Sequence, residues 1–176
     1  MKKLLLLVSL CLAVLSAGAQ RCEVASFFHC CASTKYVEPQ TKETPTQNFV
    51  DLGLPSGTLW KDRNEEGFYN LEQALSAFGS SIPAVEQFKE LKRCCRWSWT
   101  GSGYKVTGPN GKSLLLPAVG YRDCDDCIYD EGTAGNYWSS TPFAPDYGWY
   151  MYISASEVGT DGNYHCVSLS VRLVRR

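Results

Sequence analysis

The sequence is poor in the residues that most often carry catalysis, and it lacks a long apolar span. Only two histidines occur in the 176 residues, and no Gly-x-Ser-x-Gly motif is present, which argues against a hydrolytic triad. The net charge of −1 gives no sign of a surface for nucleic acid or anionic lipid. The longest apolar run, residues 4–15, is too short for a comfortable membrane span. We therefore expect no nucleic-acid partner and no transmembrane anchor in the mature chain.

The first 19 residues have the pattern of a bacterial secretory signal peptide. Lys2 and Lys3 precede the apolar run, and Ala17-Gly18-Ala19 provides an A-x-A cleavage site. The sequence thus predicts three parts: a signal peptide at 1–19, a tether with a cysteine-rich start at 20–47, and a folded domain at 48–176. We expect the protein to be exported to the periplasm, the cell surface or the extracellular space.

Cysteine is abundant for a chain of this length. One of the nine cysteines, Cys11, lies in the predicted signal peptide. An even number of cysteines in an exported chain favours disulfides, but the spacing does not determine which pairs form. In the folded domain the disulfide candidates are Cys94, Cys95, Cys124, Cys127 and Cys166. The remaining three, Cys22, Cys30 and Cys31, are consistent with a plain linker, a small stapled knot or disulfide-linked self-association.

Two helices are expected early in the folded domain. Leu71, Ala74, Leu75 and Phe78 recur at helical spacing after Asn70, a good N-cap. Gln73 completes a capping box, and Gly79 suits the C-terminal end. A second helix is expected near Val85–Cys94, with Val85, Phe88 and Leu91 on its buried side and a weak N-cap at Ala84.

After residue 96 the apolar period changes from helical to alternating, which predicts strands. Gly108–Gly111 is expected to form a hairpin turn, and Gly159–Gly162 a second turn. We expect Asp123–Ala134 to be an acidic loop and Tyr164–Val174 to be the last strand. The fold class predicted from these patterns is α+β.

Five ordered stretches resemble one family of bacterial domains. The first is Val50-Asp51-Leu52-Gly53-Leu54-Pro55-Ser56-Gly57-Thr58-Leu59-Trp60. The others are Pro83…Glu86-Gln87-Phe88…Glu90-Leu91, Tyr104-Lys105-Val106-Thr107-Gly108-Pro109-Asn110-Gly111, Leu116-Pro117-Ala118…Gly120-Tyr121-Arg122, and Tyr137-Trp138-Ser139-Ser140-Thr141-Pro142 with Ser170-Val171-Arg172. Together they resemble the Fibrobacter succinogenes major paralogous domain, which is abundant in Bacteroidales.

This resemblance implies a fold and a general role. The family is similar to the C-type lectin-like fold, in the branch that includes formylglycine-generating enzymes. It implies two helices packed on twisted antiparallel sheets, with the first and last strands adjacent. It also implies a binding or adhesion role, although a fold by itself is a weak guide to function.

The cysteines and acidic residues of 123–131 favour structural roles over catalysis or metal binding. Cys124-Asp125-Asp126-Cys127 has redox spacing but lacks the following helix that would activate a thiol. The acidic residues of 123–131 follow no calcium-loop spacing, and the calcium-binding triplets of lectins are missing. We therefore expect a non-catalytic protein without a cofactor or a metal ion. A thiol- or metal-dependent enzyme centred on Cys124 and Cys127 is the alternative.

The clearest candidate for a binding surface surrounds 147–165. Alternation in the strand at 149–153 assigns Trp149, Met151 and Ile153 to the core and leaves Tyr150 and Tyr152 on the outer face. Tyrosine combined with Asn and Asp is typical of binding surfaces, because rigid aromatic area is joined to adaptable hydrogen-bonding groups. The predicted ligand-binding residues are Asp146, Tyr147, Tyr150, Tyr152, Asp161, Asn163, Tyr164 and His165. The expected ligand is a glycan or a protein.

Three residues are assigned structural roles. Arg172 alternates with Val171 and Leu173, so it is expected to be buried and to need a partner. Asp51 is the favoured partner, with Asp130 and Glu131 as competitors, and Trp138 is expected to be part of the scaffold. The overall prediction is a secreted binding or adhesion module, with the enzyme above and a disulfide-linked structural adhesin subunit as alternatives.

Overall fold

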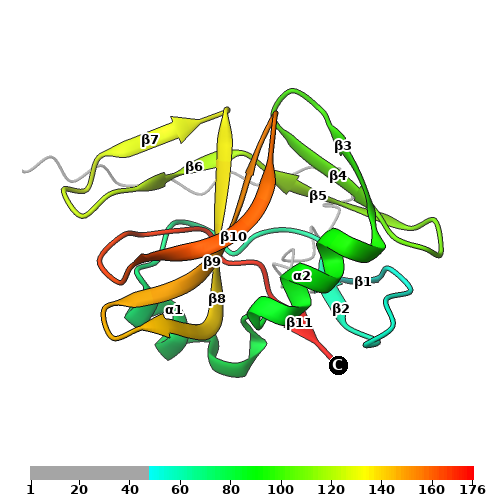
Figure 1. The fold of residues 1–176 in the computed structure, drawn as a ribbon, viewed down its shortest axis with the longest axis horizontal. Helices are drawn as coiled ribbons and strands as arrows, with labels where there is room; N and C mark the ends of the chain where they lie inside the picture. The colour runs from blue at the N-terminus through cyan, green and yellow to red at the C-terminus, as the bar shows by residue number, and fades with distance from the viewer. Residues whose placement is uncertain (1–47) are drawn as a thin grey trace, which may run out of the picture. The chain divides into compact units, whose positions relative to one another are not determined.

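The computed structural model describes residues 48–176, which form a mixed α+β unit (Figure 1). The predicted signal peptide, the tether, and Cys22, Cys30 and Cys31 lie outside the described residues. The helical elements are α1 (Leu71–Phe78), a 3₁₀ turn (Gly79–Ser81) and α2 (Val85–Cys94). No helix within 48–176 is long and apolar enough to cross a membrane.

Eleven strands form three sheets among these residues. A five-stranded sheet has the order β10 (Val158–Tyr164), β9 (Tyr147–Ser154), β8 (Ala134–Ala144), β6 (Val119–Arg122) and β7 (Ile128–Glu131). A three-stranded sheet contains β3 (Arg96–Trp99), β4 (Gly103–Thr107) and β5 (Ser113–Pro117). The third sheet contains β1 (Phe49–Asp51), β2 (Leu59–Lys61) and β11 (Val174–Arg175).

Both helices form where their sequences predict. At the start of α1, the side chain of Asn70 accepts a hydrogen bond from the Gln73 backbone N–H at 2.9 Å, and Gln73 accepts one from the Asn70 N–H at 3.1 Å. These two bonds satisfy N–H groups that would otherwise be unpaired at the helix end. The weak N-cap Ala84 of α2 is supplemented from β8, because Thr141 Oγ1 accepts the Val85 N–H at 3.1 Å. One expectation fails: Leu75 is 40% exposed rather than buried.

The central strand β8 carries an apolar cluster on each face of the five-stranded sheet. Tyr137 belongs to a first cluster with Phe88 and Leu91 of α2, whereas Trp138 belongs to a second cluster with Leu71 of α1. Successive side chains of a strand point to opposite faces, so one helix covers each face. The same alternation buries Met151 and Ile153 in the first cluster and leaves Tyr150 against the second. Trp149, expected in the core, is only half-buried.

The prediction that the first and last strands are adjacent is wrong in detail. β1 and β11 share a sheet, but both pair with β2, which lies between them. The pairing of β6 with β8 is parallel, so the sheets are not purely antiparallel.

Several predicted loops and strands also differ. Residues 165–173 make isolated bridges, such as Tyr69 with Leu169, instead of the continuous strand expected over Tyr164–Val174. The expected acidic loop contains β7, which pairs with β6 as a hairpin. Gly159–Gly162 lies inside β10 and makes no turn.

The glycines of β10 form a pattern that is typical of a turn in the sequence, but in the structure they serve close packing. A Cβ atom at Gly159 would lie 2.3 Å from the Tyr152 ring, and one at Gly162 would lie 2.5 Å from the Phe143 ring. Aromatic side chains from neighbouring strands occupy the space that a side chain would need. These glycines are therefore required by close approach within the sheet.

Arg172 is fully buried, as expected, but its predicted partners are wrong. Its guanidinium donates to Asn64 Oδ1 at 2.9 Å, to the Lys61 carbonyl at 2.9 Å and to the Leu115 carbonyl at 2.7 Å. The predicted partner Asp51 is exposed and accepts the Gly53 N–H instead. The alternative partners, Asp130 and Glu131, lie on the exposed strand β7. The three acceptors explain how a buried cation is tolerated without a carboxylate.

Trp138 is fully buried, as expected for a scaffold residue. Its indole Nε1 donates a hydrogen bond of 2.7 Å to the carbonyl of Tyr69, which fixes β8 to the segment that leads into α1.

Candidate functional site

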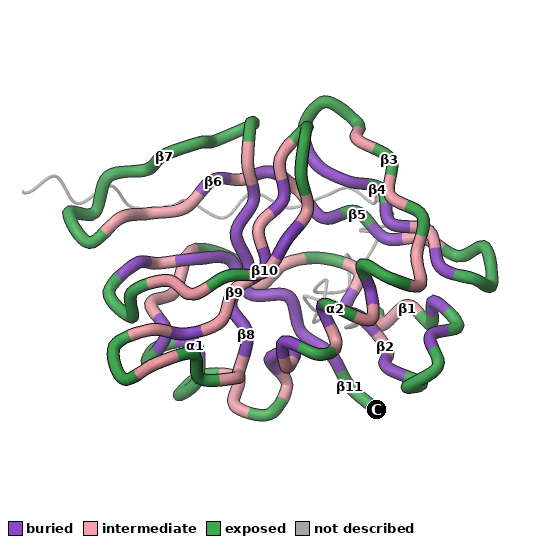
Figure 2. Tube along the Cα trace, viewed as in Figure 1, coloured by how far each residue is buried: buried purple, intermediate pink, exposed green. Residues whose placement is uncertain are grey.

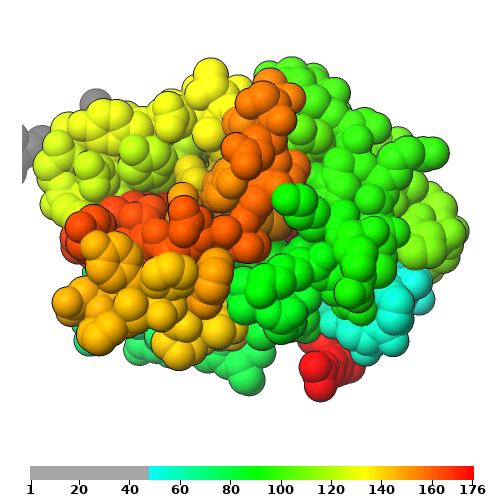
Figure 3. Space-filling model, viewed as in Figure 1, coloured from blue at the N-terminus to red at the C-terminus, as the bar shows by residue number. Residues whose placement is uncertain are grey.

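A cavity of about 390 Å³ lies between the β6–β7 hairpin, strands β8 and β9, and the end of β10. The hairpin lies alongside the segment after β10 on the face shown in Figure 3, where the two are drawn in yellow-green and orange-red. Backbone hydrogen bonds in both directions between Arg122 and Ser168 hold them together. The lining residues are Tyr121, Asp123, Asp130, Ala134, Asn136, Tyr150, Tyr152, Ile153, Ser154, Asn163, Tyr164 and Val167. We call this cavity the tyrosine cleft.

One wall of the tyrosine cleft is built by β8 and β9. Asn136 of β8 lies directly opposite Tyr152 of β9, and Tyr150 is the next outward residue along β9. The rings of Tyr150 and Tyr152 are 6.0 Å apart. Asn136 is only 8% exposed, yet its side-chain amide has no hydrogen-bond partner among residues 48–176. The amide is not among the fully buried groups that lack a partner, so it is accessible and presents hydrogen-bonding capacity to the cleft.

A second wall is the β6–β7 hairpin. Strand β7 is exposed along its length (Figure 2), and it crosses close to β6 at a glycine. A Cβ atom at Gly120 would lie 2.1 Å from the Tyr129 carbonyl oxygen, and Gly120 has a φ of 74°. The hairpin supplies Tyr121, Asp123 and Asp130 to the cleft. Asp130 itself has a φ of 57°, in a region that Asp and Asn tolerate better than most residues.

A disulfide joins the hairpin to the third wall. Cys124, in the turn between β6 and β7, bonds Cys166, which follows β10. Asn163, Tyr164 and Val167 line the cleft next to this bond. The prediction of a disulfide is thus confirmed, and the structure supplies the pairing that the sequence left open.

The charged side chains that line the tyrosine cleft, Asp123 and Asp130, are both acidic. Burial raises the pKa of Tyr121, and the carboxylates of Asp130, Asp123 and Asp125 raise it further. Burial also raises the pKa of Tyr150, with a further contribution from Asp161. None of the cleft's lining residues, all within the described part of the chain, is lysine, arginine or histidine.

The predicted ligand-binding residues separate into two groups. Tyr150, Tyr152, Asn163 and Tyr164 line the tyrosine cleft, and Asp161 lies opposite Tyr150 on β10. The other three, Asp146, Tyr147 and His165, are outside its lining. The Tyr147 ring lies 4.4 Å from that of Tyr164, and the His165 N–H donates to the Asp146 carbonyl at 3.1 Å.

Sequence reasoning missed the contribution of the hairpin and of β8. The sequence places Asp123 and Asp130 in an acidic loop, with Asp130 also a competing partner of Arg172, and Tyr121 in a family motif, but it assigns no role in binding to these residues or to Asn136. The available signal was the concentration of carboxylates at 123–131. The alternating pattern does not reveal which distant strand this segment will approach.

The arrangement of thiols differs from a CxxC redox pair. Cys124 is bonded to Cys166, so the exposed Cys127 does not have it as a free partner. Cys94 and Cys95 are unbonded in the described residues, and both pack against the first apolar cluster. Burial raises the pKa of Cys95 to about 11, which keeps this thiol protonated and weakly nucleophilic at neutral pH. No group of three or more His, Cys, Asp or Glu side chains within 48–176 is arranged to hold a metal ion.

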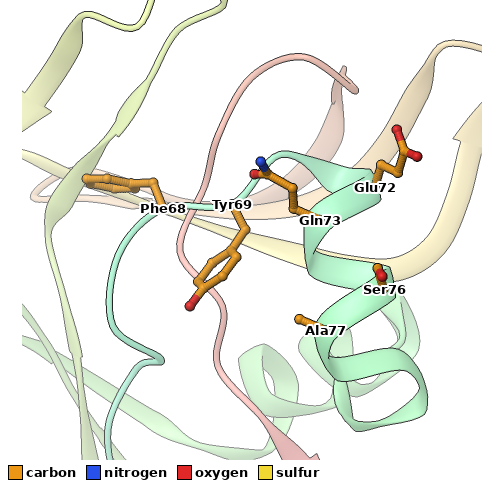
Figure 4. Close-up of a pocket in the computed structure, with 6 residues that line it drawn as sticks. All are labelled: Phe68, Tyr69, Glu72, Gln73, Ser76 and Ala77. Atoms are coloured by element: carbon orange, nitrogen blue, oxygen red, sulfur yellow. The ribbon is translucent and has the colours of Figure 1, made fainter.

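A second hollow, of about 560 Å³, lies beside α1. Figure 4 shows Gln73 and Ala77 of α1 projecting toward the segment that carries Phe68 and Tyr69, whereas the Phe68 ring and Glu72 point away from the space between them. Two of its polar groups are already used: the Tyr69 hydroxyl donates to the Glu66 carbonyl at 2.7 Å, and Gln73 belongs to the capping box. This hollow therefore offers less for recognition than the tyrosine cleft.

Comparison with known proteins gives no assignment for this site. No family model matches the chain, and neither a curated protein nor a solved structure matches it.

Proposed function

We propose that this protein is an exported, non-catalytic binding module that holds a glycan or a group of a protein ligand in the tyrosine cleft. One observation carries the proposal: four tyrosines, two asparagines and two aspartates converge on a cavity of about 390 Å³. Cavities of a few hundred Å³ with aromatic walls and a few converging polar groups are the usual form of a small-ligand site.

The chemistry of the lining supports binding rather than catalysis. Tyrosine rings provide rigid contact area at a low cost in side-chain entropy, and asparagine adapts its hydrogen bonds to the ligand. Of the described residues that line the cleft, none is a cysteine or a histidine. The thiol enzyme is disfavoured because the Cys124 sulfur is engaged with Cys166.

We further propose membership of the Fibrobacter succinogenes major paralogous domain family and a C-type lectin-like fold. The five ordered motifs support this, as do the two helices and the sheet that contains both β1 and β11. The predicted signal peptide supports export, and the Cys124–Cys166 disulfide supports an oxidising compartment.

The test is a screen of the purified mature protein on glycan and protein arrays, followed by calorimetric titration of each ligand found. The Tyr150→Ala, Tyr152→Ala double variant is expected to weaken binding at least about tenfold, because it removes two aromatic contacts from the cleft. Phe143→Ala removes an exposed aromatic side chain outside the cleft and serves as the control. Unchanged affinity in the folded double variant would exclude the cleft as the binding site.

A further inference from the structure

We propose that the tyrosine cleft is selective for a protonated primary amine, such as that of an amino sugar or a lysine side chain. This inference rests on the proposed function and adds the chemical class of the ligand. Three features of the cleft carry it: aromatic rings, carboxylates without a cationic partner in the lining, and the side-chain amide of Asn136, which has no hydrogen-bond partner among the described residues.

The first feature is the set of aromatic rings in the lining. Tyr121, Tyr150, Tyr152 and Tyr164 line one cavity although they come from β6, β9 and β10. The face of an aromatic ring is electron-rich, so it attracts an ammonium group that has shed part of its water. Neutral sugars also stack on such faces, so this feature alone does not choose between the two ligand types.

The second feature is charge. Asp123 and Asp130 both line the cleft, and the lining contains no cationic side chain to balance them. The nearest cation in the hairpin is Arg122, whose Nη1 is already paired with Asp126 Oδ1 at 2.9 Å. Two carboxylates with no cation beside them in the lining favour a cationic ligand group over a neutral one, because their fields add in the cleft.

The third feature is Asn136. Its side chain is more than nine-tenths buried and lines the cleft, and it has no hydrogen-bond partner among the described residues. Within the described residues the one fully buried side-chain atom without a partner is Trp60 Nε1, so the Asn136 amide remains accessible from the cleft and a ligand can pair with it in place of water. The Asn136 Oδ1 can accept an N–H from a primary ammonium, whereas a quaternary ammonium offers no such donor.

The experiment compares matched probes by ligand-observed NMR and calorimetry on the full mature chain. Glucosamine is compared with glucose, which differs at one substituent. Nα-acetyl-lysine methylamide is compared with its Nε-acetylated form, which lacks the charge. The charged member of at least one pair is expected to bind about tenfold or more tightly than its neutral counterpart, and to weaken as salt is added.

Isosteric variants test whether the cleft carboxylates cause the preference. Asp123→Asn and Asp130→Asn remove one charge each while keeping shape, and asparagine tolerates the positive φ of Asp130. Each is expected to reduce the preference for the amine at least about threefold. Glu72→Gln removes the same charge outside the cleft and is expected to change nothing.

The outcomes separate this inference from the proposed function. A preference in the lysine pair alone identifies a protein ligand, and a preference in the glucosamine pair alone identifies an amino sugar. Equal binding within both pairs, no binding of any probe, or a preference that survives both Asp variants overturns the inference. If array ligands still depend on Tyr150 and Tyr152 in that case, the cleft remains the binding site but is not selective for amines.

Discussion

At the scale of single residues, Arg172 is a buried charge that the fold must provide with hydrogen-bond acceptors. Its guanidinium is fully buried and donates to one side chain and to two carbonyls from distant segments. Burial lowers its pKa to about 10, so the cation persists at neutral pH. The residue thereby links the segment after β2 to β5 without a salt bridge to a carboxylate.

Replacing Arg172 is therefore expected to be costly. Arg172→Ala leaves the carbonyls of Lys61 and Leu115 unpaired and opens a void, so we expect a loss of unfolding free energy on the order of 3 kcal/mol. Chemical denaturation monitored by tryptophan fluorescence measures it.

Two further variants help to explain the loss of stability expected for Arg172→Ala. Arg172→Lys keeps the charge but cannot reach three acceptors at once, so it is expected to lie between the wild type and Arg172→Ala. Arg63→Ala is the control, because the Arg63 side chain is 59% exposed. Equal stability of wild type and Arg172→Ala would show that these hydrogen bonds do not stabilise the fold.

At the scale of elements, the β6–β7 hairpin depends on its attachments more than on its own packing. All four residues of β7 are exposed, and an isolated two-stranded hairpin is only marginally stable in water. The Cys124–Cys166 bond and the Arg122–Ser168 backbone hydrogen bonds connect it to the segment after β10. The tyrosine cleft has its shape only while these attachments persist.

Removing the disulfide is expected to loosen this wall of the cleft. The bond closes a sequence separation of 42 residues, for which a stabilisation of about 2–4 kcal/mol is typical. The Cys124→Ser, Cys166→Ser double variant is expected to melt at a lower temperature and to exchange amide hydrogens faster in β7. Calorimetry and hydrogen exchange measured by mass spectrometry provide the two readouts.

Cys127→Ser is the matched control, since Cys127 is exposed and unbonded in the structure. It is expected to leave both the melting temperature and the exchange of β7 unchanged. If the double variant matches this control in both measurements, the disulfide does not hold the hairpin in place.

At the scale of the whole molecule, two apolar clusters are joined through one strand. Tyr137 and Trp138, neighbours on β8, belong to different clusters on opposite faces of the sheet. Disrupting either cluster removes support from β8 and therefore weakens the other. We expect the two clusters to unfold as one cooperative unit.

One substitution in each cluster tests this cooperativity. Leu91→Ala in the first and Leu169→Ala in the second each remove a fully buried side chain, at a cost of about 2–5 kcal/mol. Both variants are expected to show a single thermal transition, shifted equally in circular dichroism and tryptophan fluorescence. Two separate transitions, or a shift seen by one probe only, would mean that the clusters unfold independently.

The sequence by itself determined the features that depend on local interactions. The N-cap at Asn70, the bounds of α2 and the Gly108–Gly111 hairpin turn follow from spacing and capping within a few residues. Strand alternation places Tyr150 and Tyr152 on the face opposite Met151 and Ile153, but it does not reveal that Tyr150 packs against the second apolar cluster on that face. Burial of Arg172 was predictable for the same reason, since its neighbours are apolar.

Only the tertiary structure decided which distant residues these elements contact. The partners of Arg172, the pairing of Cys124 with Cys166 and the approach of the hairpin to β9 and β10 all join positions far apart in the chain. Gly159 and Gly162 predict a turn because glycine is common in turns. In the structure they instead leave room for the rings of Tyr152 and Phe143 to pack closely. Local patterns specify conformation and the buried face, whereas long-range contacts arise when distant apolar surfaces are buried together. The tyrosine cleft, built from five strands, β6 to β10, and the segment after β10, is a product of those contacts.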